Sequence, residues 1–147
     1  MPTQTSLTAT DLLRKRHEEI KALFAQTLHA EGTSRNEPFE RLCAMLAMHE
    51  TAEETFVHPL ARSISDAADT IVLKRLEEEL AATEQLAKLE AMTPTDDGFD
   101  AAFLQFQSAV LQHAEAEELE LFPLIDAHCR DNELLVLADA IIAAETR

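Results

Sequence analysis

The sequence predicts an all-α protein, an up-down-up-down four-helix bundle with a short C-terminal fifth helix. Three observations support this fold class. The 147 residues include only two Gly and five Pro and are rich in Ala, Leu and Glu, which favour helices. Apolar residues recur at helical spacing over four long segments. The loops between these segments are short, and short loops make consecutive helices antiparallel.

The first two helices begin at recognisable signals. The first follows a cap at Thr8 or Thr10 and ends near Leu28. The turn EGTSRNEP separates it from the second helix. Pro38 suits the first turn of that second helix, which continues to about Arg62.

The remaining helices are bounded in the same way. SISD ends the second helix, and Ser65 or Asp66 caps a third helix that reaches about Met92. The loop TPTDDG precedes a fourth helix over about 99–128. A fifth, shorter helix covers about 132–144.

Composition narrows the class of protein. The length suits one domain, 1–147, that buries its own core. The formal net charge of -16 argues against nucleic acid and anionic membranes, which need clustered Lys and Arg. The start MPTQTSLTAT lacks the basic run and apolar core of a secretory signal, and no stretch is apolar enough to span a membrane. We therefore expect a soluble, cytoplasmic protein, with Cys43 and Cys129 as reduced thiols because they fit no metal-binding or redox spacing.

One polar phrase occurs twice inside the apolar helices. The second helix contains HETAEETFVHP, from His49 to Pro59, and the fourth contains HAEAEELELFP, from His113 to Pro123. Each has a His, a Glu four residues later, a second Glu directly after it, and a Pro ten residues from the His. The chain therefore reads as two helical hairpins in tandem.

The His of each phrase and the Glu four residues later face the core. Residues four apart on a helix differ by only about 40°, so His49 and Glu53 share a face, as do His113 and Glu117. Apolar residues lie in phase with each His: Leu42, Leu46, Phe56 and Leu60 in the second helix, and Ala102, Phe106, Val110 and Leu124 in the fourth.

The first helix aims a third imidazole at the bundle axis, because His17 lies in its apolar stripe. His58 is nine positions after His49 and is expected to point the opposite way, into solvent. Burying unpaired polar groups costs on the order of several kcal/mol each. Either a His–Glu hydrogen-bond network, with water, or a metal must compensate them. Facing imidazoles and carboxylates suit iron, with Mn or Zn as substitutes, and bridging carboxylates would set two metals a few ångström apart.

These residues resemble the hemerythrin-like proteins, the HHE cation-binding domain family, from Asp11 to about His128. The family pattern is a His on the first helix, HxxxE on the second, a His on the third and HxxxE on the fourth. The sequence supplies His17, HETAE and HAEAE, with EExxxxP after both pairs.

The third helix departs from the family pattern because it contains no His. One alignment places Glu79 at the expected position, with apolar neighbours on the same side. The rival alignment places Leu80 there and leaves one metal a ligand short. Glu77 and Glu78 point further round the helix and are expected to be solvated.

The resemblance implies a di-iron site. His17 and His49 would be terminal ligands of one iron, and His113 and Glu79 would serve the second. Glu53 and Glu117 would bridge the two metals.

Four further Glu residues are ambiguous. Some family members also use the Glu after the second-helix His, here Glu50. Glu54, Glu118 and Glu120 are either solvated or close to the site, and Glu120 is nearly in phase with His113.

The resemblance implies that such iron binds O2, NO or peroxide. A carboxylate-rich ligand set should favour Fe(III) and weaken reversible O2 carriage. Three hypotheses follow: a protein that senses or buffers O2, NO or iron; a di-iron peroxidase or oxidase acting on a small oxidant; and a metal-free bundle with an interaction role.

Overall fold

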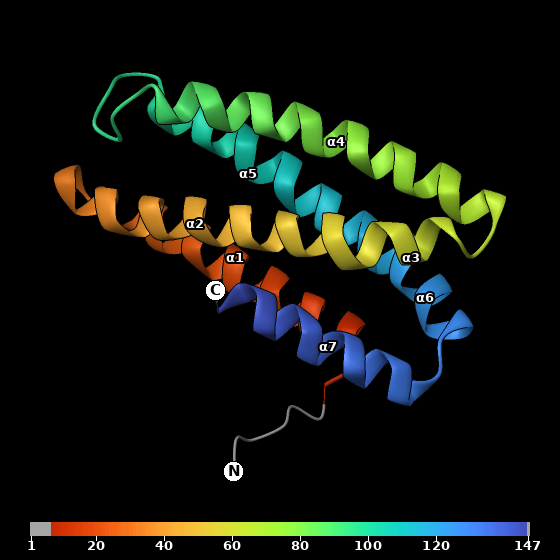
Figure 1. The fold of residues 1–147 in the computed structure, drawn as a ribbon. Coiled ribbons are helices and arrows are strands. Elements are labelled where there is room, and N and C mark those ends of the chain that lie inside the picture. The colour runs from red at the N-terminus through yellow and green to blue at the C-terminus, as the bar shows by residue number, and fades with distance from the viewer. Residues whose placement is uncertain (1–6, 147) are drawn as a thin grey trace, which may run out of the picture.

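The computed structural model describes residues 7–146, which form helices and turns and contain no strand. Four long helical segments make an antiparallel bundle, and a fifth helix packs along one side (Figure 1). The predicted fold class is confirmed. None of the helices in this range is long and apolar enough to cross a membrane. Residues 1–6, which we predict not to be a secretory signal, lie outside the described residues.

The first hairpin begins with α1 (Ala9–His29). The hydroxyl of Thr8 caps it by accepting a hydrogen bond from the Asp11 N–H at 3.3 Å. Thr10 instead donates to Asp126 Oδ1 at 2.6 Å, so of the two predicted caps Thr8 takes the role. A short 3-10 turn, η1 (Gly32–Arg35), leads into α2 (Asn36–Ala52), with Pro38 in its first turn as predicted.

The second bundle helix is continuous but not uniform. α2 is followed by a π-helical turn, η2 (Glu53–Val57), and then by α3 (His58–Arg62). The backbone N–H of His58 donates to the carbonyl of Glu53, five residues back. Pro59 follows directly. Pro has no N–H, and its ring collides with the carbonyl four residues earlier, so the wider turn accommodates it without breaking the helix.

The fourth bundle helix repeats this construction. α5 (Phe99–Ala116) is followed by the π-helical turn η3 (Glu117–Leu121) and by α6 (Phe122–His128), with Pro123 after the turn. The Phe122 N–H donates to the carbonyl of Glu117. In both halves the π turn therefore begins at the Glu four residues after the His of the repeated phrase and ends two residues before its Pro.

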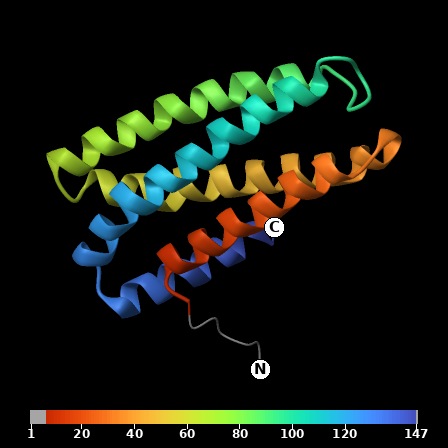
Figure 2. The same ribbon diagram turned by 180° about the vertical axis from the view of Figure 1, so that it is seen from behind.

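The other helices complete the bundle. α4 (Asp66–Glu90) is capped by Ser65, whose hydroxyl accepts from the Ala68 N–H at 3.1 Å. α1 packs against α2, and α4 against α5. α7 (Asp131–Glu145) lies along α1 and α2. In Figure 2, which views the molecule from behind, α1 lies in front of α7. Arg16 fixes this helix with hydrogen bonds of 3.0 and 2.8 Å to the Glu145 carboxylate.

The apolar core has two separate parts. One contains the first residues of α1 with the C-terminal parts of the second and fourth bundle helices, including Leu13, Val57 and Phe122. The other contains Phe24, Leu42 and the phenylalanines at the start of α5. The predicted polar residues lie between these two clusters on all four bundle helices. A polar layer thus crosses the middle of the core.

Candidate metal centre

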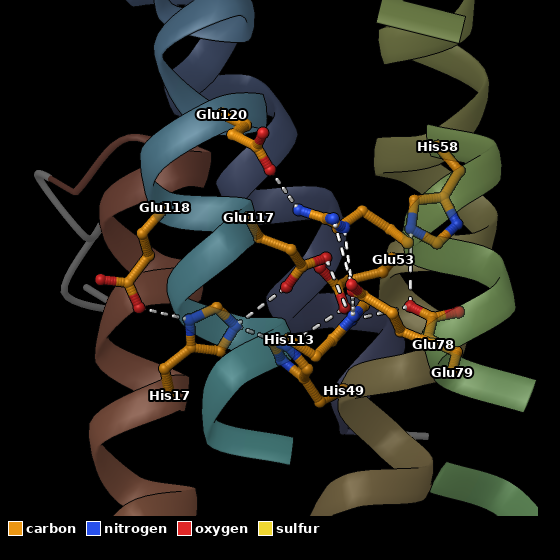
Figure 3. A network of polar contacts seen from close by, with 11 residues as sticks. His17, His49, Glu53, His58, Glu78, Glu79, His113, Glu117, Glu118 and Glu120 are labelled. Carbon is orange, nitrogen blue, oxygen red and sulfur yellow. Dashed lines mark hydrogen bonds and ion pairs between the residues drawn. The ribbon is translucent and has the colours of Figure 1, made fainter. Parts of the chain in front are cut away.

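The structure brings together all six residues that the sequence singled out as ligands (Figure 3). Each bundle helix contributes at least one of them. Five are buried, and the imidazole of the sixth, His113, is 13% exposed. The six are His17 on α1, His49 on α2, Glu53 at the start of η2, Glu79 on α4, His113 on α5 and Glu117 at the start of η3.

One half of the centre is built on two imidazoles. His17 Nε2 lies 3.1 Å from His49 Nε2 and 3.3 Å from Glu117 Oε1. His49 Nε2 lies 3.3 Å from Glu53 Oε1. These four side chains each offer one ligand atom, and all four atoms lie within 4.8 Å of one another.

The other half has one imidazole and three carboxylates. His113 Nε2 lies 3.3 Å from Glu79 Oε1 and 3.6 Å from Glu117 Oε2. With Glu53 they form a second group whose ligand atoms lie within 4.8 Å of one another. Glu53 and Glu117 belong to both groups, as the bridging role implied by the family requires. The ligand roles themselves remain a prediction.

Many polar atoms of this layer are buried without a partner. Such atoms cost on the order of 1–3 kcal/mol each, and more when charged, unless something compensates them. A cation surrounded by imidazole nitrogens and carboxylate oxygens would do so, so the residues fit the metal that the pattern implies. The atoms without hydrogen-bond geometry to any described residue include His49 Nδ1, Glu53 Oε2, His113 Nε2 and both carboxylate oxygens of Glu79 and of Glu117.

The two shared carboxylates differ in charge. Burial raises the pKa of Glu53, but the positive charge of His49 and the neighbouring Glu117 carboxyl group outweigh it and hold that pKa well below its ordinary range. Burial and the charge of Glu53 raise the pKa of Glu117 well above its ordinary value. A proton on Glu117 would allow its carboxyl group to donate a hydrogen bond to Glu53, so the two shifts support one another.

The three imidazoles respond to the same surroundings. Burial and the neighbouring His49 lower the pKa of His17. Burial also lowers the pKa of His49, but the negative charge of Glu53 raises that pKa by more, so the net shift is upward. For His113, burial lowers the pKa, but the Glu79 carboxylate 3.3 Å away and the charge of Glu53 raise it by more, so the net shift is upward.

Two imidazoles are held from behind by carboxylates. Glu118 Oε2 lies 2.7 Å from His17 Nδ1, and Glu78 Oε1 lies 3.0 Å from His113 Nδ1. Both contacts leave Nε2 directed at the centre, an arrangement typical of metal-bound His. Our prediction that Glu78 is solvated is wrong: only 36% of its side chain is exposed, and it contacts a predicted ligand.

Arg75 was missed by the sequence analysis. Its side chain is 2% exposed and forms contacts with Glu78 at 2.9 Å and with Glu120 at 2.6 Å. It places one positive charge beside an anionic site. Its position four residues before Glu79, on the same face of α4, was the signal that could have identified it.

The prediction that His58 is solvated is also wrong, since it is 4% exposed. The reasoning assumed a regular α-helix from His49 onward. The π turn η2 spreads one turn over an additional residue, so the helix face rotates and His58 turns inward. His58 was also predicted to point away from the centre, and this is wrong for the same reason, because its Nε2 lies 3.7 Å from Glu79 Oε1.

The exposed fractions of Glu79 and Leu80 favour the alignment that places Glu79 at the third-helix position. Glu79 is 8% exposed and faces the centre, whereas Leu80 is 63% exposed. Glu77 is exposed as expected. Glu120 is half exposed and pairs with Arg75.

The structure also shows where Glu50, Glu54 and the two cysteines lie relative to the centre. Glu50 and Glu54 each offer an oxygen within 4.8 Å of one from Glu79, although Glu54 is exposed. Burial and the charge of Glu79 raise the pKa of Glu50. Cys43 and Cys129 are free thiols, as predicted, and burial raises the pKa of Cys43 to about 11.

A small cavity adjoins the centre. Its volume is about 70 Å³, and five of the six predicted ligands line it, all except Glu117. Apolar side chains, among them Ile20, Leu46, Phe106 and Val110, form most of the remaining wall. A water molecule needs roughly 10–15 Å³ by this measure, so the cavity has room for a molecule of a few atoms.

A four-helix bundle with this buried layer of imidazoles and carboxylates defines a cation-binding helical protein. The model of the Hemerythrin HHE cation binding domain family matches residues 8–125. The chain belongs to this family, as the resemblance of its motifs indicated.

Two proteins are similar to this chain over different extents. The crystal structure of a Hemerythrin HHE cation binding domain-containing protein from Mycobacterium kansasii superimposes with a TM-score of 0.84. The match covers 95% of this chain and 86% of that one at 22% identity, and it shows the shared fold. A DNA nickase from Nostoc sp. strain PCC 7120 is 27% identical over 116 residues, which are 78% of this chain and 32% of the nickase. This chain thus corresponds to about a third of that protein.

Proposed function

We propose that this protein holds two iron ions in the buried layer and binds O2, NO or peroxide beside them, so that it senses or buffers such a molecule or iron itself. The observation that carries the proposal is the cavity of about 70 Å³ that touches both groups of predicted ligands. When bound, iron with open positions supplies the affinity for a small oxidant.

The roles of the residues follow from their positions. His17 and His49 would hold one metal, His113 and Glu79 the other, and Glu53 and Glu117 both. Glu118 and Glu78 keep the imidazoles of His17 and His113 oriented. The apolar walls of the cavity exclude bulk water and select a small, weakly polar ligand.

A di-iron peroxidase or oxidase is the second candidate, and two observations favour it. The second group contains three carboxylates and one imidazole, a hard ligand set that favours Fe(III). Glu50 is the ionisable residue that lines the cavity outside the predicted ligand set, so its carboxyl group can exchange a proton with a bound oxidant. Rapid peroxide consumption by the iron-loaded protein would favour this candidate.

Nucleic acid is not a proposed partner. The nicking activity named for the Nostoc protein belongs to a chain about two and a half times as long, and the net charge of -16 opposes contact with phosphates. Membrane surfaces with anionic lipids are disfavoured for the same reason.

Elemental analysis of protein purified without added metal tests the proposal. We expect two equivalents of iron per chain, and optical spectra of the ferrous protein that change on addition of O2, NO or peroxide. If the analysis finds stoichiometric Mn or Zn and no iron, the site stands but the proposed identity of its metal is wrong. Absence of any bound metal, together with failure to bind added Fe(II), would refute the site and leave the metal-free bundle with an interaction role.

A further inference from the structure

His58 is a buried imidazole that the proposed site does not use. Its side chain is 4% exposed, and neither ring nitrogen has a hydrogen-bond partner within residues 7–146. Figure 3 shows the ring directed at Glu79, and His58 Nε2 lies 3.7 Å from Glu79 Oε1. This distance is within about 1 Å of an ordinary N–H···O hydrogen bond.

The fold places His58 there by a specific device. Its backbone N–H closes the π turn by donating to the Glu53 carbonyl, and without that turn the side chain would point away from the core. The same turn begins at Glu53, a predicted bridging ligand. Ligand and imidazole are therefore positioned by one backbone element.

The other half of the repeat shows what occupies this position there. Phe122 is the counterpart of His58, nine residues after His113, and its ring stacks on His17 at 5.8 Å between centroids and 17° between planes. Phe122 thus packs behind the predicted ligand of the first bundle helix, His17, and His58 packs behind that of the third, Glu79. Phe122 backs an imidazole, which has an aromatic face. His58 backs the carboxylate Glu79, which accepts hydrogen bonds.

We propose that His58 is a positioning residue of the second metal site and donates a hydrogen bond from Nε2 to Glu79. A carboxylate has several acceptor positions, so this contact leaves others free for a cation. The donor fixes a side chain with flexible torsions and offsets part of its negative charge. Glu79 and His58 together thus take the place of the His and Phe found in the other half. This inference rests on the two-metal site proposed above.

Variants of His58 separate positioning from packing. His58→Phe supplies the side chain used in the other half, His58→Leu is a smaller apolar alternative should the first variant fail to fold, and His58→Gln retains an N–H donor near Nε2. Calorimetric titration with Fe(II) under anaerobic conditions, and with Zn(II), counts equivalents and gives their affinities. Loss of a supporting hydrogen bond behind a ligand weakens metal binding by about 10–100-fold. We expect that loss for the second equivalent in the two apolar variants, an unchanged first equivalent, and recovery in His58→Gln.

The decisive measurement is the double variant Glu79→His/His58→Phe, which reproduces the His and Phe pairing of the other half. In the Glu79→His background, His58→Phe should cost little, because an imidazole ligand needs no donor behind it. His128→Phe, on the exposed end of α6, is the matched control.

Four results overturn the inference. If wild type binds two metals and His58→Phe and His58→Leu do so equally well, His58 has no such role, while the proposed site stands. If His58→Phe costs as much in the Glu79→His background, it does not act through Glu79. Equal loss in His58→Gln would indicate packing alone. If wild type binds no metal, the proposed function fails and this inference with it.

Discussion

Replacing each shared carboxylate by its amide should separate folding from metal binding. Glu53 and Glu117 are counterparts in the repeat and are 1% and 0% exposed. Their charge states differ, because the pKa of Glu53 is lowered beside His49 and that of Glu117 is raised by burial and by Glu53. Gln has the shape of a protonated Glu without its acidity. Glu117→Gln therefore imitates the uncharged side chain that the raised pKa favours at this position in the metal-free protein. Glu53→Gln instead removes a negative charge that the lowered pKa favours.

The sizes of the two effects follow from these contacts. Glu53→Gln removes the anion 3.3 Å from His49 Nε2, and breaking a buried pair from one side costs about 3–5 kcal/mol. For a chain of this size, 1 kcal/mol moves Tm by about 2–4 °C, so Tm should fall by about 6–20 °C. Glu117→Gln should change the stability by less than about 1 kcal/mol, or raise it at neutral pH, because it leaves no acid to be kept protonated.

The pH dependence has opposite signs at the two positions. The lowered pKa of Glu53 stabilises the fold above the ordinary value of 4.5, and this stabilisation is lost as the pH falls through the lowered pKa. The raised pKa of Glu117 stabilises the fold below 4.5, and that contribution is lost as the pH rises toward the raised value. The slope of stability above pH 4.5 should therefore flatten in Glu117→Gln.

Thermal and urea unfolding in the presence of a chelator measures these differences. Glu54→Gln and Glu115→Gln are controls, because both side chains are exposed near the same turns. Both amide variants should lose metal at both positions, since each carboxylate belongs to both ligand groups. Equal destabilisation by the two amides, or a greater effect of Glu117→Gln, would show that the assignment of charge is wrong.

Three further predictions concern the metals. Glu79→Ala should empty the second position while Leu80→Ala leaves two equivalents, as counted by Fe(II) titration, and a Glu79→Ala variant that binds two irons as tightly as wild type would refute the assignment. Glu78→Gln should weaken the second equivalent by about 10–100-fold, because its neutral amide supports His113 less well; an equal loss in Glu77→Gln would contradict this. Chelation should lower Tm by about 11–22 °C if each of the two metals is present at about 100 times its Kd, because each then contributes about 2.7 kcal/mol and the pair about 5.4 kcal/mol. An unchanged Tm would indicate that no metal stabilises the fold.

Regular helical spacing was sufficient to predict the fold and the inward direction of His17, His49 and His113. The same spacing failed for His58, because a π turn cannot be anticipated from the phase of an ideal α-helix. The clue was chemical: a Pro inside a helix needs a local change in backbone pairing, and Pro59 directly follows His58. On the second bundle helix, His49 and Glu53 face inward as predicted, and the error appears at His58, where the turn ends.

The side chains behind the ligands were harder to predict for a different reason. Glu78 lies on the flank of the α4 core stripe, where phase alone leaves burial undecided, and Arg75 lies within the stripe, where a charged residue is not expected. Their positions depend on the fourth bundle helix, since Glu78 contacts His113 on α5 and Arg75 contacts Glu120 on η3. A single sequence reports which face of a helix is apolar, but not which charged residue at its edge finds a partner on the next helix.

The two halves of the repeat are unequal, and the inequality lies on one side of the centre. The first group has two imidazoles, one of them held by the half-buried Glu118. The second has one imidazole and one more carboxylate, and the charge of Glu78 beside it is offset by Arg75. The buried Arg75 thus stands where the fold most needs a positive charge. Where the family pattern has a third-helix His, this chain has Glu79, with the buried Arg75 on the same helix and His58 directed at it by the π turn. The second position is therefore built around a carboxylate where the first has an imidazole.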